Sequence, residues 1–278
     1  MNNIQDYRAF YASLIVRGTG SSNERLIAAF SSVEREHYVG KGPWQIAVVA
    51  GYIPTISDDP RLIYQDVLVG LATDRGINNG QPSLHATFLD ACSPVDGEFV
   101  IHVGAGTGYY TAILAALVGP TGNVVAFEIQ ADLADRARDN LKHLPNVTVL
   151  SDSATEAHLP NADVIYVNAG ATHPLASWLD ALNVGGRLIF PLTPNDELGC
   201  MLLVTRATPS GYAASVVARV AFIPCVGARD DFTSKALAAA LETQSIETVR
   251  SLHRGTNPDS TAWCIGTDWW LSTAEPTE

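Results

Sequence analysis

The stretch Phe99–Tyr109, FVIHVGAGTGY, decides the fold. Its first five residues form a short apolar run typical of a buried strand, and an apolar helical pattern follows it over 109–118. Three glycines lie between the two. Glycine lets the backbone turn tightly and lets a ligand approach the main chain, and a helix start offers unpaired amide groups at the positive end of its dipole. The stretch therefore predicts a ligand-binding turn between a strand and a helix.

The spacing of the glycines selects the class of cofactor. A dinucleotide-binding turn reads G-x-G-x-x-G, which would place its third glycine at position 109, where this chain has Tyr109. The observed G-x-G-x-G pattern is typical of methyltransferases. Glu128 ends the next predicted strand, 24 residues after Gly104, where a carboxylate can accept hydrogen bonds from ribose hydroxyls. Asp152 follows the third strand, where a carboxylate can accept from an adenine amino group. The three features together predict an S-adenosylmethionine site; singly, they could be a plain glycine turn, a solvated acid and a turn residue.

Strand and helix patterns alternate from residue 99 onward. This alternation indicates an α/β fold of the Rossmann-like, class I methyltransferase type, with a mainly parallel, doubly wound sheet. The runs 201–206 and 215–222 have only a turn between them and predict an antiparallel pair that closes the sheet. The predicted strands are 99–103, 123–127, 147–150, 163–167 and 187–192, and the predicted helices between them are 109–118, 132–142 and 174–182.

Three segments are expected along the chain. Residues 1–78 form an N-terminal segment packed on the core, helical at first and irregular over 38–66, with a short apolar strand at 67–71. Residues 79–231 form the S-adenosylmethionine-binding core. Residues 232–278 form a small α+β C-terminal extension, whose WCIGTDWW run is read either as an aromatic mini-core or as a lid or peptide-docking surface.

Composition excludes several classes of function. The 278 residues are 47% hydrophobic, enough for a sizeable core, and carry a formal net charge of -12. A negative surface argues against binding to nucleic acid or to anionic membranes. The N-terminus is not a secretory signal, and no run of roughly 18 apolar residues predicts a membrane span. The four cysteines lack metal-site spacing, so we expect reduced thiols in a cytoplasmic protein without a metal. The sequence does not fix the oligomeric state.

Five blocks carry a resemblance to a known family over about residues 24–230. Together they resemble the protein-L-isoaspartate O-methyltransferase family. The blocks are Arg35–Val39, similar to R-x-x-Y/F-V; Gly80–Ala86, at the place of the T-I-S-x-P segment and its helix; Val103–Tyr109, similar to V/I-G-x-G-x-G-Y; Asn183–Pro191, similar to L-x-x-G-G-R-L-I-x-P; and Phe222–Gly227, similar to F-V-P-L-x-G.

The resemblance implies an S-adenosylmethionine-dependent O-methyltransferase that acts on an isoaspartyl or aspartyl carboxylate of a peptide or protein. The methyl group of the sulfonium is already activated, and a carboxylate with a pKa near 4 is already ionised at neutral pH. Such an enzyme need only align the reactants and exclude water. The predicted cofactor-binding residues are Asn79, Gly80, His85, Gly104, Ala105, Gly106, Thr107, Gly108, Tyr109, Glu128, Ile129, Asp152 and Ser153. For His85 the alternative is an exposed helical histidine.

The chain departs from the family where the acceptor is held. The Thr and Ser of T-I-S are replaced by Asn78 and Gly80, so no catalytic residue is assigned. The acid that usually begins the glycine motif is His102, which we read as a satisfied core residue. Asn78, Asn79 and Asn168 are the candidates to bind substrate, and each could instead be a turn residue. Alternative functions are methylation of another acceptor, such as a tailored peptide or a small metabolite, a cofactor-binding module without catalysis and, last, a hydride-transferring dehydrogenase.

Overall fold

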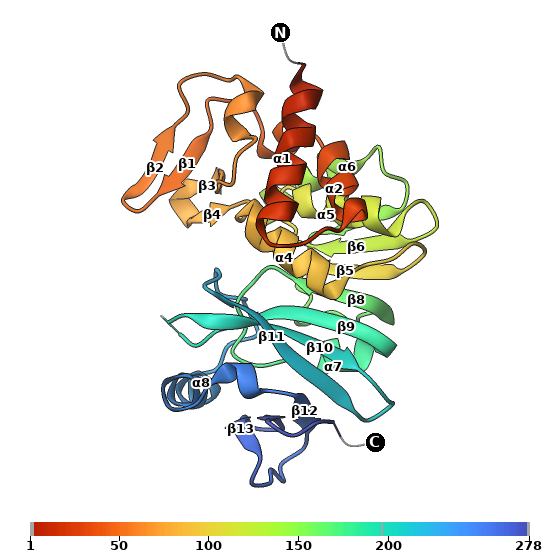
Figure 1. Ribbon diagram of the computed structural model, residues 1–278, viewed down its shortest axis with the longest axis vertical. Helices are drawn as coiled ribbons and strands as arrows, with labels where there is room; N and C mark the ends of the chain where they lie inside the picture. Colours follow the sequence, from red (N-terminus) through yellow and green to blue (C-terminus); the bar gives the residue numbers. More distant parts are fainter. Residues whose placement is uncertain (1–2, 196, 277–278) are drawn as a thin grey trace. The chain divides into compact units, whose positions relative to one another are not determined.

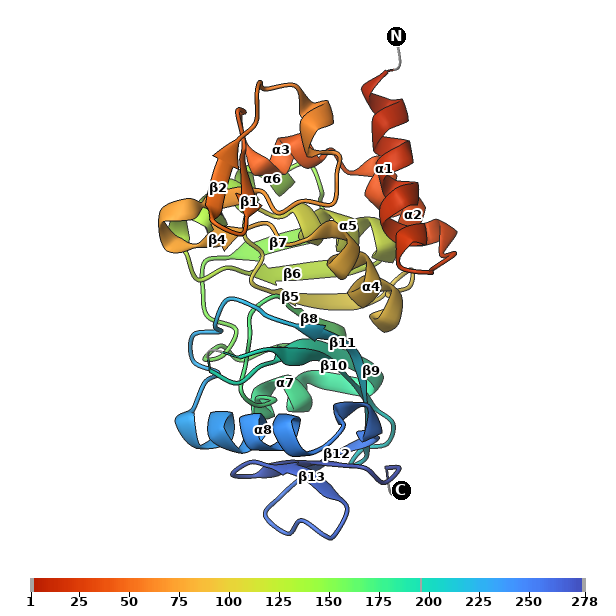
Figure 2. The same ribbon diagram turned by 60° about the vertical axis from the view of Figure 1, so that its left-hand side comes forward.

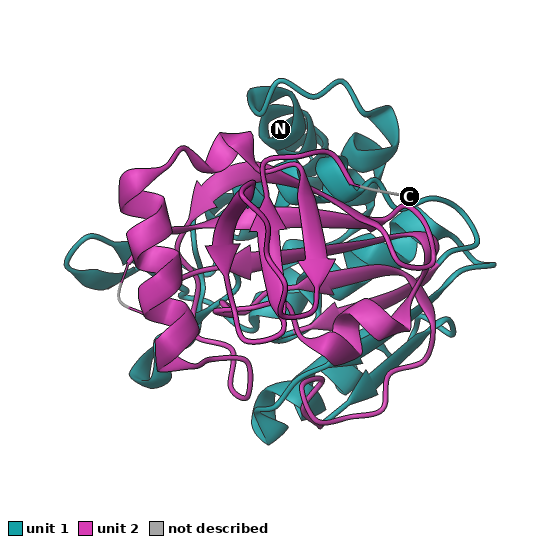
Figure 3. Cartoon of the chain, turned by 90° about the horizontal axis from the view of Figure 1, so that it is seen from below, with its two compact units in different colours: residues 1–98, 104–151 teal, residues 99–103, 152–278 magenta. Residues whose placement is uncertain are grey.

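The computed structural model describes residues 3–195 and 197–276. The chain forms two compact units (Figure 3). The first unit runs up to Glu98 and continues with Gly104–Ser151. The second unit contains Phe99–Val103 and the chain from Asp152 onward. The segment boundaries predicted at residues 78 and 231 describe sequence blocks rather than packing units, and they stay a prediction.

Six α-helices and two short 3-10 helices lie in the first unit (Figure 1). Helix α1 starts with a capping box: the Asn3 side chain accepts from the helix backbone, and the Asp6 side chain accepts from the Asn3 nitrogen. The prediction that the N-terminal segment is helical at first is confirmed by α1 and α2. The helices are α1 (Ile4–Gly18), α2 (Glu24–Ser32), α3 (Arg35–Val39), α4 (Pro82–Cys92), α5 (Tyr109–Val118) and α6 (Ala131–Leu141), with η1 (Pro60–Ile63) and η2 (Thr73–Arg75).

The prediction of irregular structure over 38–66 is wrong in part, because an antiparallel hairpin lies inside it. Its strands β1 (Gln45–Val48) and β2 (Gly51–Pro54) expose most of their side chains, so they lack the apolar alternation that marks a half-buried strand. The strand predicted at 67–71 is shifted, because the structure has β3 (Gly70–Ala72) paired with β4 (Ile77–Asn78). Strands β6 (Asn123–Phe127) and β7 (Val147–Leu150) match the predicted ranges and pair in parallel.

The second unit is built on a sheet whose strands run in the order β13-β14-β12-β11-β10-β9-β8-β5. Strands β5, β8 and β9 pair in parallel, whereas β9–β10 and β10–β11 are antiparallel, so the predicted closing pair is confirmed. Figure 1 shows β9, β10 and β11 side by side. The elements are β5 (Phe99–Val103), β8 (Ala162–Val167), α7 (Ala176–Ala181), β9 (Leu182–Leu192), β10 (Gly199–Arg206), β11 (Tyr212–Val220), α8 (Asp231–Thr243), η3 (Ile246–Thr248), β12 (Ser251–Arg254), β13 (Ala262–Ile265) and β14 (Trp269–Ser272).

The C-terminal extension continues this sheet. Strand β12 pairs with β11 and β14, and helix α8 packs against β13 (Figure 2). Trp263, Trp269 and Trp270 are all buried, and the ring of His253 stacks on Trp270 with centroids 4.0 Å apart. Burial of all three indoles agrees with the interpretation of the WCIGTDWW run as a mini-core.

Three further observations concern the cysteines, the helices and the clustering of metal-ligating side chains. All four cysteines are buried thiols. In residues 3–195 and 197–276, no helix combines the length and the apolar character needed to cross a membrane. Within the same residues, no three His, Cys, Asp or Glu side chains gather as metal ligands would.

Candidate cofactor and acceptor site

The glycine loop between β5 and α5 adopts a backbone that only glycine readily allows. Gly104, Gly106 and Gly108 have φ values of 78°, 56° and 96°, all in the left-handed region. A Cβ atom at Gly108 would also lie 2.6 Å from the Cδ1 atom of Leu141. The nitrogens of Gly104 and Ala105 both donate to the carbonyl oxygen of Phe127, at 2.9 and 3.0 Å. The loop is therefore held in one shape by its own sequence and by the end of β6.

The start of helix α5 has no side-chain cap. Its N-cap Gly108 has no side chain to accept from the amides of the first turn, which begins at Tyr109. The buried hydroxyl oxygen of Thr107 has no hydrogen-bond partner among the described residues. The positive end of a helix without a side-chain cap suits an anionic group such as a carboxylate. The loop thus fits the amino-acid moiety of S-adenosylmethionine.

Glu128 lies directly beside this loop. Its Oε2 atom accepts from the Gly106 nitrogen at 2.7 Å and its Oε1 atom accepts from the Gln130 nitrogen at 2.9 Å. Burial raises the pKa of Glu128, and the hydrogen bonds from Gln130 and Gly106 oppose that rise. Each carboxylate oxygen keeps a further lone pair for a ribose hydroxyl. Ile129 follows with 47% of its surface exposed, an apolar face suited to a purine ring.

Asn78 and Asn79 use their carbonyl oxygens in local structure. The Oδ1 atom of Asn78 accepts from the Gly80 nitrogen at 2.9 Å, which closes a turn of the Asx type. The Oδ1 atom of Asn79 accepts from the Val69 nitrogen at 3.0 Å and from the Nη2 of Arg35 at 3.3 Å. The buried Nδ2 atom of Asn79 has no hydrogen-bond partner in the part of the chain that the structure describes.

Gly80 and His85 are in close contact. Gly80 has a φ of +73°, and a Cβ atom built on it would lie 2.3 Å from the Nε2 of His85. The His85 ring stacks on Tyr110 with centroids 3.6 Å apart, and the Tyr110 hydroxyl donates to the Gly80 carbonyl at 3.4 Å. The alternative of an exposed helical histidine is wrong, because His85 is only 2% exposed. The imidazole occupies the space where a side chain at position 80 would begin.

Arg35 is a buried residue that connects several loop segments by hydrogen bonds, and the sequence analysis did not assign it to the site. It is fully buried, and its guanidinium donates to the carbonyl oxygens of Ile63, Gln65 and Val67 as well as to Asn79. The same group lies 5.8 Å from the ring centroids of both Tyr11 and Tyr109. Arg35 begins one of the blocks that resemble the family, but the sequence alone does not show that this arginine is buried.

Asp152 and Ser153 begin the second unit, directly after β7. Asp152 is exposed, and its Oδ1 atom accepts from the Ser153 nitrogen at 2.7 Å. The Ser153 hydroxyl lies 2.7 Å from the hydroxyl of Thr155. The Asp152 carboxylate is therefore open to an outside donor, whereas Ser153 stabilises the turn.

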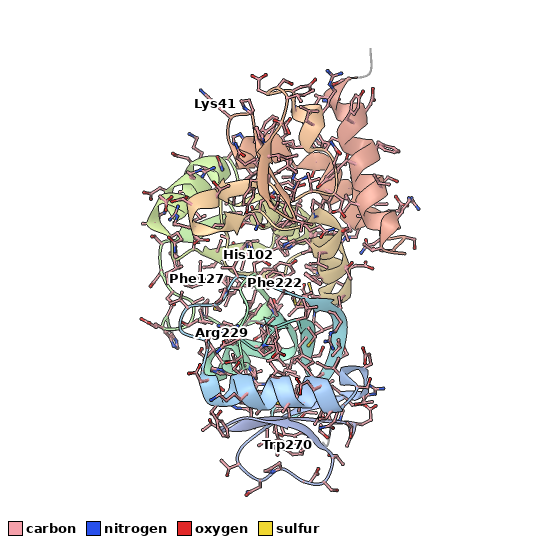
Figure 4. The ribbon with its side chains drawn as sticks, turned by 90° about the vertical axis from the view of Figure 1, so that its left-hand side faces the viewer. Lys41, His102, Phe127, Phe222, Arg229 and Trp270 are labelled. Atoms are coloured by element: carbon pink, nitrogen blue, oxygen red, sulfur yellow. The ribbon has the colours of Figure 1, made fainter. Side chains whose placement is uncertain are left out.

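Asn168 follows β8, and its side chain contacts His102 on the neighbouring strand β5. Figure 4 labels His102. The Asn168 Nδ2 and the His102 Nε2 are 2.8 Å apart, and the Asn168 nitrogen donates to the Val103 carbonyl at 2.8 Å. Burial lowers the pKa of His102 to about 3, so its imidazole is neutral. His102 is a buried core residue with a hydrogen-bond partner, as predicted. The Oδ1 atom of Asn168 is buried and has no partner among residues 3–195 and 197–276.

Arg229 braces the loop that follows Asn168. Its Nη1 atom donates to the Gly170 carbonyl at 2.8 Å and to the Thr193 hydroxyl at 2.9 Å, and its Nε atom donates to the Asn195 side chain at 3.1 Å. Sequence reasoning missed this residue, because its three partners are all more than 30 positions away along the chain.

Several relatives share this sequence pattern. Proteins named protein-L-isoaspartate O-methyltransferase from Ignicoccus hospitalis and Methanoculleus marisnigri are 33% identical over 169 residues and 28% identical over 217 residues. The first match covers 59% of this chain and 79% of the relative, and the second covers 76% and 88%. A protein of Pelobacter propionicus named protein-L-isoaspartate O-methyltransferase 2 is 30% identical over 230 residues, which cover 81% of this chain and 92% of the relative.

Solved structures of low sequence identity share the fold. A structure named protein-L-isoaspartate O-methyltransferase superposes with a TM-score of 0.67 at 19% identity, covering 95% of this chain and 86% of its own. A Plasmodium falciparum structure named for the same enzyme, in complex with S-adenosyl-L-homocysteine, gives 0.64 at 20% identity and covers 82% of this chain and 100% of its own. These likenesses confirm the predicted Rossmann-like α/β methyltransferase fold.

The sequence model of protein-L-isoaspartate(D-aspartate) O-methyltransferase matches residues 9–230, most of the chain. This range contains the glycine loop, Glu128 and Asn168. The chain therefore belongs to the protein-L-isoaspartate(D-aspartate) O-methyltransferase family of S-adenosylmethionine-dependent methyltransferases.

Proposed function

We propose that this protein transfers a methyl group from S-adenosylmethionine to an isoaspartyl or aspartyl side-chain carboxylate of a peptide or protein. The observation that carries the proposal is the hydrogen bond between the glycine loop and Glu128. The family match over residues 9–230 supports it. The names of the relatives support the carboxylate acceptor.

The residues that would hold the cofactor divide by the moiety that each suits. The backbone over Gly104–Tyr109 suits the amino-acid part, Glu128 suits the ribose, and the exposed apolar face of Ile129 suits the adenine ring. Asp152 would accept from the adenine amino group, beside Ser153. On the family resemblance we also place Gly80, His85 and, through its main chain, Asn79 in the cofactor-binding set.

In this reaction the protein mainly has to position the acceptor carboxylate and the cofactor. When bound, the cofactor would supply a methyl group on a sulfonium, whose sulfur would be left as a neutral thioether that needs no protonation. The acceptor carboxylate is ionised at neutral pH and attacks as it stands. The side chains around it therefore bind, orient and exclude water, and Asn78, Asn79 and Asn168 are the amides proposed to bind the acceptor. On this basis we propose that no metal ion is needed, so a chelator should leave the rate unchanged.

The direct test is a methyl-transfer assay on matched peptides. The purified protein is incubated with labelled S-adenosylmethionine and one of three peptides that differ only in isoaspartate, aspartate or asparagine at one position. We expect base-labile methyl ester on the isoaspartyl or the aspartyl peptide and none on the asparagine control. An absence of ester on both acidic peptides, in a protein that binds S-adenosylhomocysteine, would contradict the proposal.

One observation favours a second candidate, methylation of a different acceptor such as a tailored peptide or a small metabolite. The family's serine position is Gly80, and the His85 ring fills the space that a side chain there would need. An acceptor site without that hydroxyl can have a different specificity. An intact-mass screen of peptide and metabolite pools with cofactor present decides between the candidates, by showing which compound gains 14 Da, about the mass of one methylene. Binding of cofactor with no methylated product in any pool would instead indicate a module without catalysis.

Two further proposals concern the cellular location of the protein and the class of its binding partner. We propose that the protein acts in the cytoplasm, because all four cysteines are buried thiols. The net charge of -12 supports a peptide or protein partner rather than nucleic acid or an anionic membrane. Cell fractionation and a salt titration of binding to DNA test these two points.

A further inference from the structure

The side-chain amide of Asn79 has a chemically defined orientation. Its Oδ1 atom lies 3.0 Å from the Val69 nitrogen and 3.3 Å from the Nη2 of Arg35. Both neighbours can only donate, since a backbone N–H and a guanidinium have no acceptor atom. A flipped amide would set two donors against an NH2 group. The oxygen must therefore face Arg35 and Val69, and the NH2 group must face the other way.

The NH2 group of Asn79 is a buried donor without an acceptor among the described residues. Asn79 as a whole is 7% exposed. Native proteins satisfy nearly all buried donors, so one that is held fixed and left unsatisfied needs an explanation. The amide is enclosed, so contact with a ligand needs a shift of the atoms that cover it. A hydrogen bond gained by the amide would offset that shift.

The place of Asn79 in the chain says which ligand suits it. Asn79 lies between Asn78 and Gly80, the two positions where the family hydroxyls are absent. Gly80 cannot carry a side chain beside His85, and the Asn78 oxygen is used by the turn. A carboxylate is acceptor-only and needs a donor. The NH2 group of Asn79 is such a donor in this segment.

We propose that Asn79 donates from Nδ2 to the methyl-accepting carboxylate and replaces the missing hydroxyls, and that Arg35 is the positioning residue that fixes the Asn79 amide. This inference rests on the proposed function. The contact would hold the carboxylate oxygen that does not attack, and leave the other oxygen to meet the methyl carbon. Arg35 acts only through Asn79 and touches neither reactant.

The decisive variant is Asn79→Asp, because a carboxylate keeps both accepted hydrogen bonds and loses the donor. We expect the melting temperature to stay the same or rise, since Arg35 gains an opposite charge. The dissociation constant for S-adenosylhomocysteine should stay within about twofold. The KM for the isoaspartyl or aspartyl peptide should rise at least about tenfold. Asn257→Asp, which places the same new charge on an exposed loop, is the matched control and should change neither constant.

Arg35→Lys tests the positioning role. Lysine cannot bridge three carbonyls and Asn79 in the guanidinium geometry, so the amide loses its fixed orientation. In folded protein we expect a raised peptide KM, with a smaller increase in the Asn79→Asp background than in the wild type. If Arg35→Lys does not fold, Asn79→Asp alone decides the assignment of the donor.

The outcomes separate this inference from the function on which it rests. Wild-type protein that forms no ester contradicts the proposed function itself. Ester formation by wild type with an unchanged peptide KM in Asn79→Asp shows that the amide is only an internal structural group. A loss of S-adenosylhomocysteine binding in that variant, at unchanged peptide KM, would assign the amide to the cofactor and overturn the inference.

Discussion

The carboxylate of Glu128 accepts a hydrogen bond from the backbone nitrogen of Gly106 at 2.7 Å. The acid proposed to hold the ribose therefore also holds the cofactor loop before any ligand arrives. This relationship gives Glu128 two roles that a substitution changes together: it stabilises the loop, and it carries the proposed contact with the ribose.

We expect Glu128→Gln to weaken both roles. An amide can accept from only one of the two backbone N–H groups with its oxygen and faces the other with an NH2 group. The unliganded protein should lose about 1–2 kcal/mol of unfolding free energy. Affinity for S-adenosylhomocysteine should fall by about 1–3 kcal/mol, or roughly five- to 150-fold. Calorimetry and denaturant titration measure the two effects, with the exposed Glu242→Gln as control. An unchanged dissociation constant would remove Glu128 from the ribose site.

Gly80→Ser should destabilise the protein rather than restore an ancestral hydroxyl. The new Cβ would overlap the buried His85 ring, a change that costs about 1–3 kcal/mol, and the φ of +73° adds about 1 kcal/mol. Gly76→Ser is the matched control, since Gly76 has a φ of +70° and open space around its Cβ position. Chemical denaturation of both variants separates the backbone strain of a positive φ, which both share, from the steric overlap with His85, which only Gly80→Ser has. Adding His85→Ala should recover part of the stability of Gly80→Ser but none in Gly76→Ser; equal losses in the two serine variants would disprove the overlap.

The buried His102 should make stability fall with acid. Its folded pKa is about 3, below the value near 6.5 of an unfolded histidine. Between these values the unfolded chain binds a proton that the folded chain does not, so this contribution to stability is present above about pH 6.5 and is lost as the pH falls toward 3. The slope is about 1.4 kcal/mol per pH unit.

His102→Gln keeps a hydrogen-bonding partner for Asn168 and does not titrate. Denaturant titrations at several pH values from 7 to 4.5 should therefore show a flatter decline for His102→Gln than for the wild type. The exposed His158→Gln serves as the control and should follow the wild-type curve. Parallel curves for His102→Gln and the wild type would mean that His102 is protonated in the folded protein.

Trp263→Ala tests the mini-core interpretation of the C-terminal extension. The indole is 2% exposed, so its loss should cost about 3–5 kcal/mol of unfolding free energy. The peptide KM of the folded fraction should not change. A lid or docking surface predicts the reverse result, a changed KM at nearly unchanged stability, and kinetic assays below the melting temperature decide between the two.

The parts of the fold that sequence predicted well are those whose signal is local. Strands β5, β6 and β8 are mainly apolar and mostly buried, as is typical of a parallel sheet covered on both faces, and the predicted bounds of these strands and of β7 agree with the structure to within one residue. The hairpin β1–β2 was missed for the opposite reason, since its side chains are mostly exposed and leave no alternating pattern.

The candidate site was predictable in its residue types but not in its contacts. The loop and Glu128 follow from spacing along the chain. The bond between Glu128 and Gly106 spans 22 positions, and the bond between Arg35 and Asn79 spans 44. Neither has a local signature. Helical position alone also could not show that His85 turns toward Gly80 rather than toward solvent.

The C-terminal strands have a consequence for how the protein behaves at high concentration. Strand β12 pairs with β11 at Tyr212 and Ala213, and the sheet then ends at β13, which has four residues and an irregular register between Ala262 and Cys264. Long, flat edge strands template aggregation, whereas short and irregular ones resist it. The extension therefore covers the start of the β11 edge, at Tyr212 and Ala213, and ends the sheet on a short, irregular strand that is a poor template for strand addition by a neighbouring molecule.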